Sequence, residues 1–249
     1  MTRDIVFTPS NLKTFVQCPF KFKMVNLTKE VAYVQGEVAK RGEHLHSMME
    51  TILLHGWDSV TWDDDKSRAH AYKFYRIISG LVDRGWELHV EDSVATDGHG
   101  HKLDFWDKPP HNLMRCRIDV WLEHKDSDTV IVFDHKSGKK YDIDQLQLQF
   151  NAVCLQPVTG RNKYVLNFDY LDNGSLSTEK IDITGVDINK VDAMSVAHGP
   201  CSELIVALRG AQISLDLNSF PATKHRFCQW CDVRKEGKCP KYSEASMLV

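Results

Sequence analysis

The sequence predicts an α/β fold with a central β-sheet flanked by helices. Segments with the apolar spacing of helices alternate along the chain with short apolar runs that are typical of strands. A hydrophobic content of 42% provides enough apolar side chains for a core, so the 249 residues are expected to form one globular domain. The turn sequence Asp172-Asn173-Gly174 between two apolar runs indicates a β-hairpin.

The elements of the first half follow from apolar periodicity and from turn residues. Ser10 is expected to cap a short first helix, because serine accepts hydrogen bonds from the first N–H groups of a helix. In order, we expect helices over 11–15, 34–54 and 66–83, a basic and aromatic turn over 18–23, a strand over 86–94 and a long loop over 96–113.

The second half predicts two hairpins with a helix between them. In order, we expect strands over 113–123 and 129–133, a helix over 144–155, strands over 164–170 and 176–183, and a helix over 187–209 that is interrupted or ends near Gly199.

The bulk composition excludes several classes of protein. No apolar run approaches the length of a membrane span, and the N-terminus lacks the apolar core of a signal peptide, so a reducing cytoplasm is the expected location. A formal net charge of −3 means that any contact with nucleic acid depends on local positive charge. The sequence has no Walker-type phosphate-binding motif, which argues against a motor activity.

A candidate catalytic segment follows the apolar run 129–133. Asp134-His135-Lys136 places a carboxylate and an ammonium group two residues apart, so both lie on one face of a strand. A carboxylate can bind a divalent metal that lowers the pKa of its water, and a lysine can stabilise negative charge that develops on a phosphate. Asp-x-Lys alone is common, and the alternative is a strand that ends in a solvated turn.

The first hairpin gives Asp134 a partner. If the turn is centred between Asp126 and Ser127, residues whose numbers sum to 253 face each other, and Asp119 lies opposite Asp134. Two carboxylates at that separation repel each other unless a cation lies between them. A register shifted by one residue would turn Asp119 away, but the apolar residues of both strands limit such a shift.

The helix over 34–54 offers a further ligand. Gly42, His46 and Glu50 are spaced by four residues and therefore lie on one stripe. A neutral imidazole at His46 can bind the same metal, and Gly42 would allow another backbone or a DNA strand to come close. A helix histidine is more often packed or exposed than a ligand, and His44, on another face, has no expected role.

Together these residues resemble the RecB-like nucleases of the PD-(D/E)XK superfamily. The family pattern combines Gly-x3-His, Gly-x-x-Asp, Asp-Tyr-Lys-Thr-Gly and Gln-h-x-x-Tyr, where h is apolar. In the same order, the chain has Gly42-x3-His46, Cys116-Arg117-Ile118-Asp119, Asp134-His135-Lys136-Ser137-Gly138 and a helix with several glutamines. The resemblance runs from Ser10 to Cys239, although Cys116, His135 and Ser137 replace the family's usual Gly, Tyr and Thr.

The resemblance implies a restriction-endonuclease-like core with a mixed sheet and a metal-dependent nuclease site. Asp119 and Asp134 would bind Mg²⁺ or Mn²⁺, with His46 as a further ligand and the His135 carbonyl as another. Lys136 would orient or activate the attacking water and stabilise the transition state.

The glutamine of the family pattern has two candidate positions. Aligning Ala152 with the alanine that often follows the family's tyrosine makes Gln147 the motif residue and puts Asn151 at the tyrosine position. The other register uses Gln145 with Gln149. Both lack the tyrosine, so only amide side chains remain to orient the site by hydrogen bonding.

Three of the seven cysteines cluster near the C-terminus as Cys228-x2-Cys231-x7-Cys239. In a cytoplasmic protein this spacing indicates metal binding and not a disulfide framework. Cys18 is the best candidate for a fourth ligand. The remaining cysteines, which are expected to be buried small side chains, are Cys116, Cys154 and Cys201.

One cysteine before the nuclease core and three after it resemble the iron–sulfur subgroup of these nucleases, which includes AddB-type and CRISPR-associated RecB-like exonucleases. The resemblance implies a 4Fe–4S cluster on the four cysteines, with zinc on the same thiolates as the alternative. The cluster would join segments 1–33 and 223–249 into a clasp around the core, 34–222, and close a long loop.

Basic residues are the expected contacts with DNA. In the tail from Thr223, lysines and arginines alternate with Phe227, Trp230 and Tyr242, a composition that suits a single strand, although the aromatic rings could instead shield the cluster. The phosphate candidates near the proposed metal are Arg115, Arg117, Lys139 and Lys140, and weaker ones are Lys21 and Lys23.

The sequence therefore predicts a metal-dependent DNA exonuclease of recombination, repair or phage DNA processing, acting on a free end or a single strand. The iron–sulfur resemblance and the lack of a visible sequence-reading module favour an exonuclease. One alternative is a non-catalytic or weakly catalytic DNA-binding protein with the same fold and metal clasp. Another is a zinc-stapled RNA-processing enzyme. A recombination or repair protein is the expected partner, and this context rests on fold-level analogy.

Overall fold

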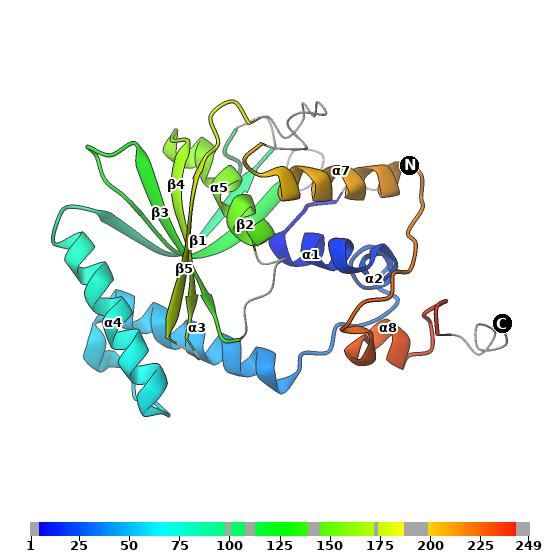
Figure 1. The fold of residues 1–249 in the computed structure, drawn as a ribbon, viewed down its shortest axis with the longest axis horizontal. Coiled ribbons are helices and arrows are strands. Elements are labelled where there is room, and N and C mark those ends of the chain that lie inside the picture. Colours follow the sequence, from blue (N-terminus) through cyan, green and yellow to red (C-terminus); the bar gives the residue numbers. More distant parts are fainter. Residues whose placement is uncertain are drawn as a thin grey trace.

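The computed structural model describes residues 5–97, 101–107, 113–138, 145–171, 174–186 and 199–242. Five strands form a central sheet in chain order: β1 (Glu87–Thr96), β2 (Met114–Glu123), β3 (Thr129–Lys136), β4 (Lys163–Tyr170) and β5 (Ser175–Asp182) (Figure 1). β3 and β4 are parallel, and the other neighbouring strands are antiparallel. The prediction of an α/β fold with a mixed central sheet flanked by helices is confirmed.

Helices cover both faces of this sheet. One face packs against α1 (Pro9–Gln17), α5 (Gln145–Thr159) and α7 (Ser202–Asp216), and the other packs against α3 (Glu37–His55) and α4 (Asp65–Val82) (Figure 1). The shorter helices are α2 (Pro19–Phe22), η1 (Lys23–Leu27), η2 (Trp57–Ser59), η4 (Cys228–Trp230) and α8 (Asp232–Lys235). In the described residues, no helix is both long and apolar enough to cross a bilayer.

α5 is the crossover between the parallel strands β3 and β4. Parallel neighbours cannot be joined by a tight turn, so a helix must carry the chain back across the sheet. Leu148, Phe150 and Leu155 of α5 are fully buried in the core beneath it. This packing fixes the first turn of α5 next to the end of β3, where the catalytic residues are predicted.

The β2–β3 hairpin has the predicted register. Val120 pairs with Phe133, and Leu122 pairs with Ile131, so the paired numbers sum to 253. The ladder stops one pair short of Asp119 and Asp134. The predicted pairing of those two residues is absent from the ladder, and the Asp119 carboxylate instead accepts the backbone N–H of His135.

The β1–β2 ladder is irregular at Glu91 and Asp119. Residues two apart in a regular strand share a face, yet Ile118 packs in the core on the α5 side and Val120 packs in the core on the α3 side. Glu91, which lies opposite Asp119 in the register of the flanking pairs, has a backbone φ of 50°. Such a left-handed conformation is uncommon outside glycine and costs on the order of 1–3 kcal/mol.

Three local details differ from the sequence predictions. Thr8, not Ser10, caps α1: its hydroxyl accepts the Asn11 N–H, and the Asn11 side chain accepts the Thr8 N–H in return. Residues 19–27 form helical turns instead of a simple turn. The last predicted helix runs to Asp216 as α7, and its expected first part, 187–198, lies outside the described residues.

The two ends of the described chain contact each other. The backbone N–H of Phe20 donates to the Pro221 carbonyl at 3.2 Å, and Lys238 Nζ donates to the Glu30 carbonyl at 2.7 Å. A small apolar cluster lies between the two segments, and its buried members are Met24, Val31, Cys231 and Val233.

Gly42 of α3 lies against the Ser137 side chain, and this contact can be tested. A Cβ at Gly42 would be 2.7 Å from the Ser137 hydroxyl oxygen, which offsets the roughly 0.5–1 kcal/mol that alanine normally adds to a helix relative to glycine. We expect Gly42→Ala to be more favourable by about 1 kcal/mol in a Ser137→Ala background than in the parent chain, measured by urea unfolding. If the effects of Gly42→Ala and Ser137→Ala on the free energy of unfolding simply add, the contact is absent.

Candidate active site

A groove of about 1170 Å³ opens beside α1, α3 and the first three strands. Three of the predicted catalytic residues, His46, Asp119 and Lys136, line it. Asp134 is buried next to Lys136. The structure therefore brings residues from a helix and two strands, which are up to 90 positions apart in the sequence, to one opening.

Three ligand atoms from His46, Glu91 and Asp119 lie within 4.8 Å of one another in this groove. His46 Nδ1 is 3.4 Å from Asp119 Oδ2. An imidazole and two carboxylates fit a divalent cation that prefers oxygen ligands, such as Mg²⁺ or Mn²⁺. We call these three residues the metal-binding group.

A backbone hydrogen bond fixes Asp119 at the end of β3. The His135 N–H donates to Asp119 Oδ2 at 2.7 Å, so the carboxylate of one strand holds the backbone of the next. This bond replaces the ladder pair that the predicted register would place there. It brings Asp119 close enough to Asp134 for the two charges to interact.

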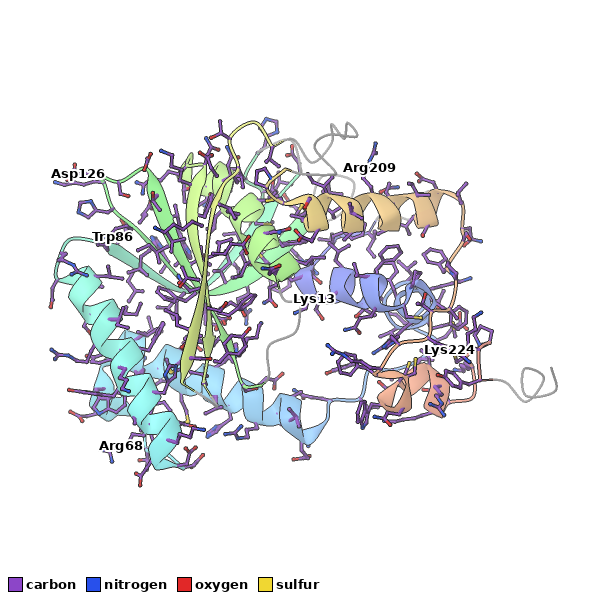
Figure 2. All side chains as sticks on the ribbon, viewed as in Figure 1. Lys13, Arg68, Trp86, Asp126, Arg209 and Lys224 are labelled. Carbon is purple, nitrogen blue, oxygen red and sulfur yellow. The ribbon has the colours of Figure 1, made fainter. Side chains whose placement is uncertain are left out.

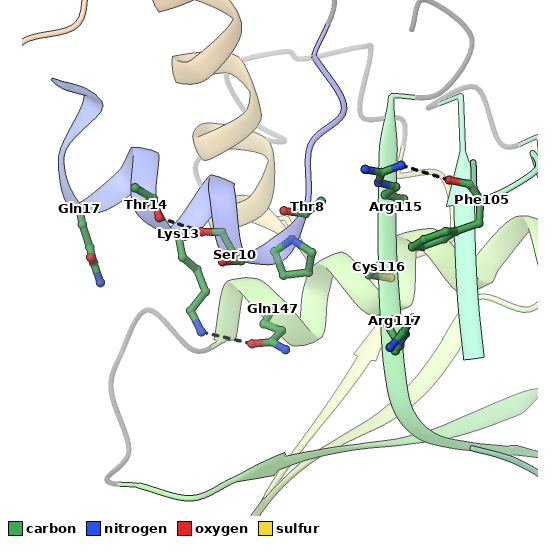
Figure 3. A pocket seen from close by; sticks show the side chains of 11 residues that line it. Thr8, Ser10, Lys13, Thr14, Gln17, Phe105, Arg115, Cys116, Arg117 and Gln147 are labelled. Atoms are coloured by element: carbon green, nitrogen blue, oxygen red, sulfur yellow. Dashed lines mark hydrogen bonds between the residues drawn. The ribbon is translucent and has the colours of Figure 1, made fainter. Parts of the chain in front are cut away.

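Lys136, Asp134 and Gln147 form a second connected set. Lys136 Nζ forms an ion pair with Asp134 and donates to Gln147 Oε1 at 2.9 Å. The Gln147 amide in turn donates to Asp134 Oδ1. From α1, Lys13 Nζ donates to the same Gln147 oxygen at 3.2 Å (Figure 3). Of the two glutamine registers, the one with Gln147 therefore contacts the predicted catalytic residues.

The other register points away from the site. Gln145 is exposed, and Gln149 is buried against α7, where its amide donates to Glu203 at 2.5 Å and its oxygen accepts the Leu204 N–H. Asn151, at the tyrosine position, is buried. His44, without a predicted role, lies 3.1 Å from Asp63.

Burial and neighbouring charges shift the pKa values of the carboxylates in the groove. Burial raises the pKa of Glu91 to about 7, and repulsion from Asp119 adds to this effect. Burial also raises the pKa of Asp134, against the opposing charge of Lys136. Burial would raise the pKa of Asp119, but the hydrogen bond and charge of His46 outweigh it, so that pKa is lowered. Clusters of shifted carboxylates are typical of functional sites.

The same contact affects His46. Burial acts to lower the pKa of His46, but the hydrogen bond to Asp119 and the charges of Asp119 and Asp134 raise it overall. In the metal-free protein, the negative charge of the groove therefore favours a proton on His46. A bound cation would displace that proton, since metals bind the neutral imidazole.

The His135 side chain enters a buried network. Its Nδ1 lies 2.9 Å from Asp169 Oδ2, and His70 Nε2 lies 2.5 Å from the other oxygen of Asp169. Both His135 and Asp169 are buried. The imidazole thus ties β3 to β4 and to α4, which leaves only the backbone of His135 for the predicted role at the metal.

Glu91 is the candidate site residue that sequence reasoning missed. It belongs to no part of the family pattern, and the loop before β2 hides its pairing with Asp119. The pairing of β1 with β2 is the feature that identifies Glu91. The numbers of paired residues sum to 210, which puts Glu91 opposite Asp119. Of the predicted phosphate contacts, Arg115 and Arg117 line pockets at the site, whereas Lys139 and Lys140 lie outside the described residues.

The four cysteines predicted to bind a metal line one small pocket. Cys18, Cys228, Cys231 and Cys239 surround it together with Tyr242. Backbone N–H groups point at two of the sulfur atoms: Thr223 donates to Cys18 Sγ at 3.4 Å, and His225 donates to Cys228 Sγ at 3.2 Å. Hydrogen bonds of this kind stabilise thiolate ligands. The three other cysteines are buried, as expected.

Comparison with protein families matches residues 6–235 to the PD-(D/E)XK nuclease superfamily. The match covers most of the chain, so the protein belongs to this superfamily. Nucleases of this superfamily cleave phosphodiester bonds and use divalent metals such as Mg²⁺ or Mn²⁺, and the metal-binding group provides a candidate site for one. A comparison with curated proteins gives no match.

The raised pKa of Glu91 predicts a pH-dependent stability in metal-free protein. The folded state keeps the Glu91 proton up to about pH 7, whereas the unfolded chain loses it near pH 4.5, so stability falls as the pH rises between these values. Glu91→Gln removes this loss. Partial exposure of the side chain limits the effect to about 1 kcal/mol, so we expect the variant to melt roughly 2–4 °C higher than the parent at pH 8 in EDTA.

Calorimetry at pH 4.5 and pH 8 measures this difference. At pH 4.5 the two proteins should melt together, because Glu91 is then protonated in the folded chain. Glu43 lines the same groove but does not belong to the metal-binding group, so Glu43→Gln is the control. It should leave the melting temperature unchanged at both pH values. A Glu91→Gln variant that is less stable than the parent at pH 8 would contradict the account.

Proposed function

We propose that this protein is a metal-dependent DNA exonuclease. The observation that carries the proposal is that the metal-binding group and the Lys136–Asp134–Gln147 set lie at one groove, in a chain of the PD-(D/E)XK superfamily. The cysteine arrangement, which resembles iron–sulfur exonucleases, supports an activity that starts at DNA ends. Recombination, repair or phage DNA processing is the proposed context, inside a cell.

Each residue has a role that follows from its contacts. His46, Glu91 and Asp119 would hold the cation, with Asp134 and the His135 carbonyl as further ligands. When bound, Mg²⁺ or Mn²⁺ supplies a water of lowered pKa and neutralises charge on the phosphate.

Lys136 lines the groove and carries a charge that can orient the attacking water and stabilise the pentavalent transition state. Gln147 holds Lys136 and Asp134 in a fixed relative position, since it bonds both. The Gln147 amide therefore orients the site by hydrogen bonds, although the chain lacks the tyrosine of the family pattern.

A non-catalytic DNA-binding protein with the same fold is the alternative. The site argues against it, because burying Asp134 beside Asp119 destabilises the fold, and a catalytic role accounts for why both carboxylates are present. A protein that only binds DNA gains nothing from two carboxylates that repel its ligand's phosphates.

Substitutions in both halves of the site test this proposal. We expect Lys136→Ala and Asp119→Ala each to lower the rate of cleavage of end-labelled linear DNA in Mn²⁺ at least about 100-fold, since each removes a group that acts on the transition state. Lys163→Ala, an exposed lysine that pairs with Asp128, should cleave at the parent rate. A closed circular substrate should resist the parent protein. Unchanged cleavage in both variants would sink the assignment.

We also propose that the cysteine pocket holds a 4Fe–4S cluster. The four thiols come from both ends of the described chain, so the 4Fe–4S cluster would join these two segments. The same segments already contact each other through the apolar side chains of Met24, Val31 and Val233. Segments 1–33 and 223–249 would then form the clasp around the core, 34–222; residues 1–4 and 243–249 of the clasp lie outside the described residues. Zinc on the same thiolates is the alternative.

A visible absorption spectrum of anaerobically purified protein distinguishes the two metals. We expect a brown protein with iron and sulfide, and we expect Cys228→Ser to lose the absorption and to melt at a lower temperature. Cys154→Ala, a buried cysteine outside the pocket, should keep the parent spectrum. A colourless parent protein that contains zinc would contradict the cluster and support the alternative.

A further inference from the structure

A second pocket, of about 450 Å³, adjoins the catalytic groove on the side of α1 (Figure 3). Ser10, Lys13 and Arg117 line both cavities, so a ligand can pass from one to the other without leaving the surface. None of the described residues of the metal-binding group lines the second pocket. Its volume suits a group of the size of one nucleotide, well below what a folded protein segment needs.

Positive charge dominates this pocket. Lys13, Arg115 and Arg117 line it, and among the described lining residues no side chain is acidic. This contrasts with the chain as a whole, whose formal net charge is −3. Hydroxyl groups of Ser10 and Thr14 stand beside the cations. Cations and hydroxyls gathered in one cavity are the usual partners of phosphate oxygens.

An aromatic surface borders Arg115. The Arg115 guanidinium lies 5.3 Å from the centre of the Phe105 ring and 5.9 Å from that of Trp106, and it donates to the Phe105 carbonyl at 3.3 Å. Phe105 lines the pocket, and Trp106 is 73% exposed. An exposed indole held next to an arginine offers a base a face on which to stack.

The pocket is connected to the catalytic residues by a shared acceptor. Lys13 and Lys136 both donate to Gln147 Oε1, at 3.2 and 2.9 Å. Arg117 lies on the other side, with Nε 3.9 Å from Glu91. Figure 2 places Lys13 in the middle of the molecule, next to the sheet, far from Arg68 on α4. A phosphate held by Lys13 and Arg117 would therefore lie one nucleotide along the DNA strand from a phosphate at the metal-binding group.

We propose that this pocket binds the nucleotide adjoining the scissile phosphate, with its phosphate on Lys13, Arg115 and Arg117 and its base against Phe105 and Trp106. The proposal rests on the proposed nuclease function. The phosphate is either the terminal one of a DNA end or an internal one of the strand. Lys13 links occupancy of the pocket to the position of Gln147, so a filled pocket also aligns Lys136.

Binding of labelled oligothymidine, measured by fluorescence anisotropy in EDTA so that no cleavage occurs, tests the proposal. We expect Arg115→Gln to weaken binding about 10-fold and to reduce the slope of log K against log salt by about 0.7, the value for one phosphate contact on a single strand. Trp106→Ala should weaken binding about 5- to 100-fold with little change in that slope. Arg68→Gln, an exposed arginine on α4, should bind as the parent does.

The source of the phosphate follows from two further probes. Tighter binding of a 5′-phosphorylated oligonucleotide than of its 5′-hydroxyl form, with the difference lost in Arg115→Gln, identifies a terminal phosphate. Equal binding, with Arg115→Gln weakening both forms alike, identifies an internal one. If the parent protein cleaves DNA, and if both Arg115→Gln and Trp106→Ala bind DNA as tightly as the parent does, the proposed nucleotide pocket is wrong. The proposed nuclease function would then still stand. Pocket-dependent binding without any cleavage would overturn the nuclease instead.

Discussion

The carboxylate of Asp119 holds the site together. It accepts the His135 N–H from β3, lies 3.4 Å from His46 of α3 and stands opposite Glu91 of β1, so four elements meet at one side chain. Its hydrogen bond to His135 takes the place of the next pair in the β2–β3 ladder. The two strands can therefore separate at this point and open the groove without leaving a backbone donor unpaired.

The site is arranged at a cost to stability. Glu91 has a left-handed backbone, the side-chain alternation of β2 changes phase at Asp119, and burial raises the pKa of both Glu91 and Asp134. Such features persist where the surrounding structure enforces them and where they serve function. The packing of α5 and the contacts of the His70–Asp169–His135 network supply that enforcement on opposite faces of β3.

Features that depend on apolar spacing and turn residues within a short segment could be predicted from the sequence, whereas features that depend on distorted pairing between strands could not. The β2–β3 register was predictable because a short polar turn and the apolar residues of both strands limited any shift in the pairing of Val120 with Phe133. Lys136 and Asp134 followed from alternation along one strand. Glu91 could not be found this way, because its place depends on a distortion that only the pairing of β1 with β2 reveals. The helical turns over 19–27 were hidden by a mixed basic and aromatic composition that suggested a surface turn.

The position of a bound cation is the most direct test of the account. Crystals soaked in Mn²⁺ and measured by anomalous scattering should show one strong peak within bonding distance of His46, Glu91 and Asp119. A second group of similar composition, Glu87, His89 and Glu123, has its ligand atoms equally close together at the far end of the same strands and acts as an internal comparison. A peak at that group, with none at Asp119, would contradict the central claim.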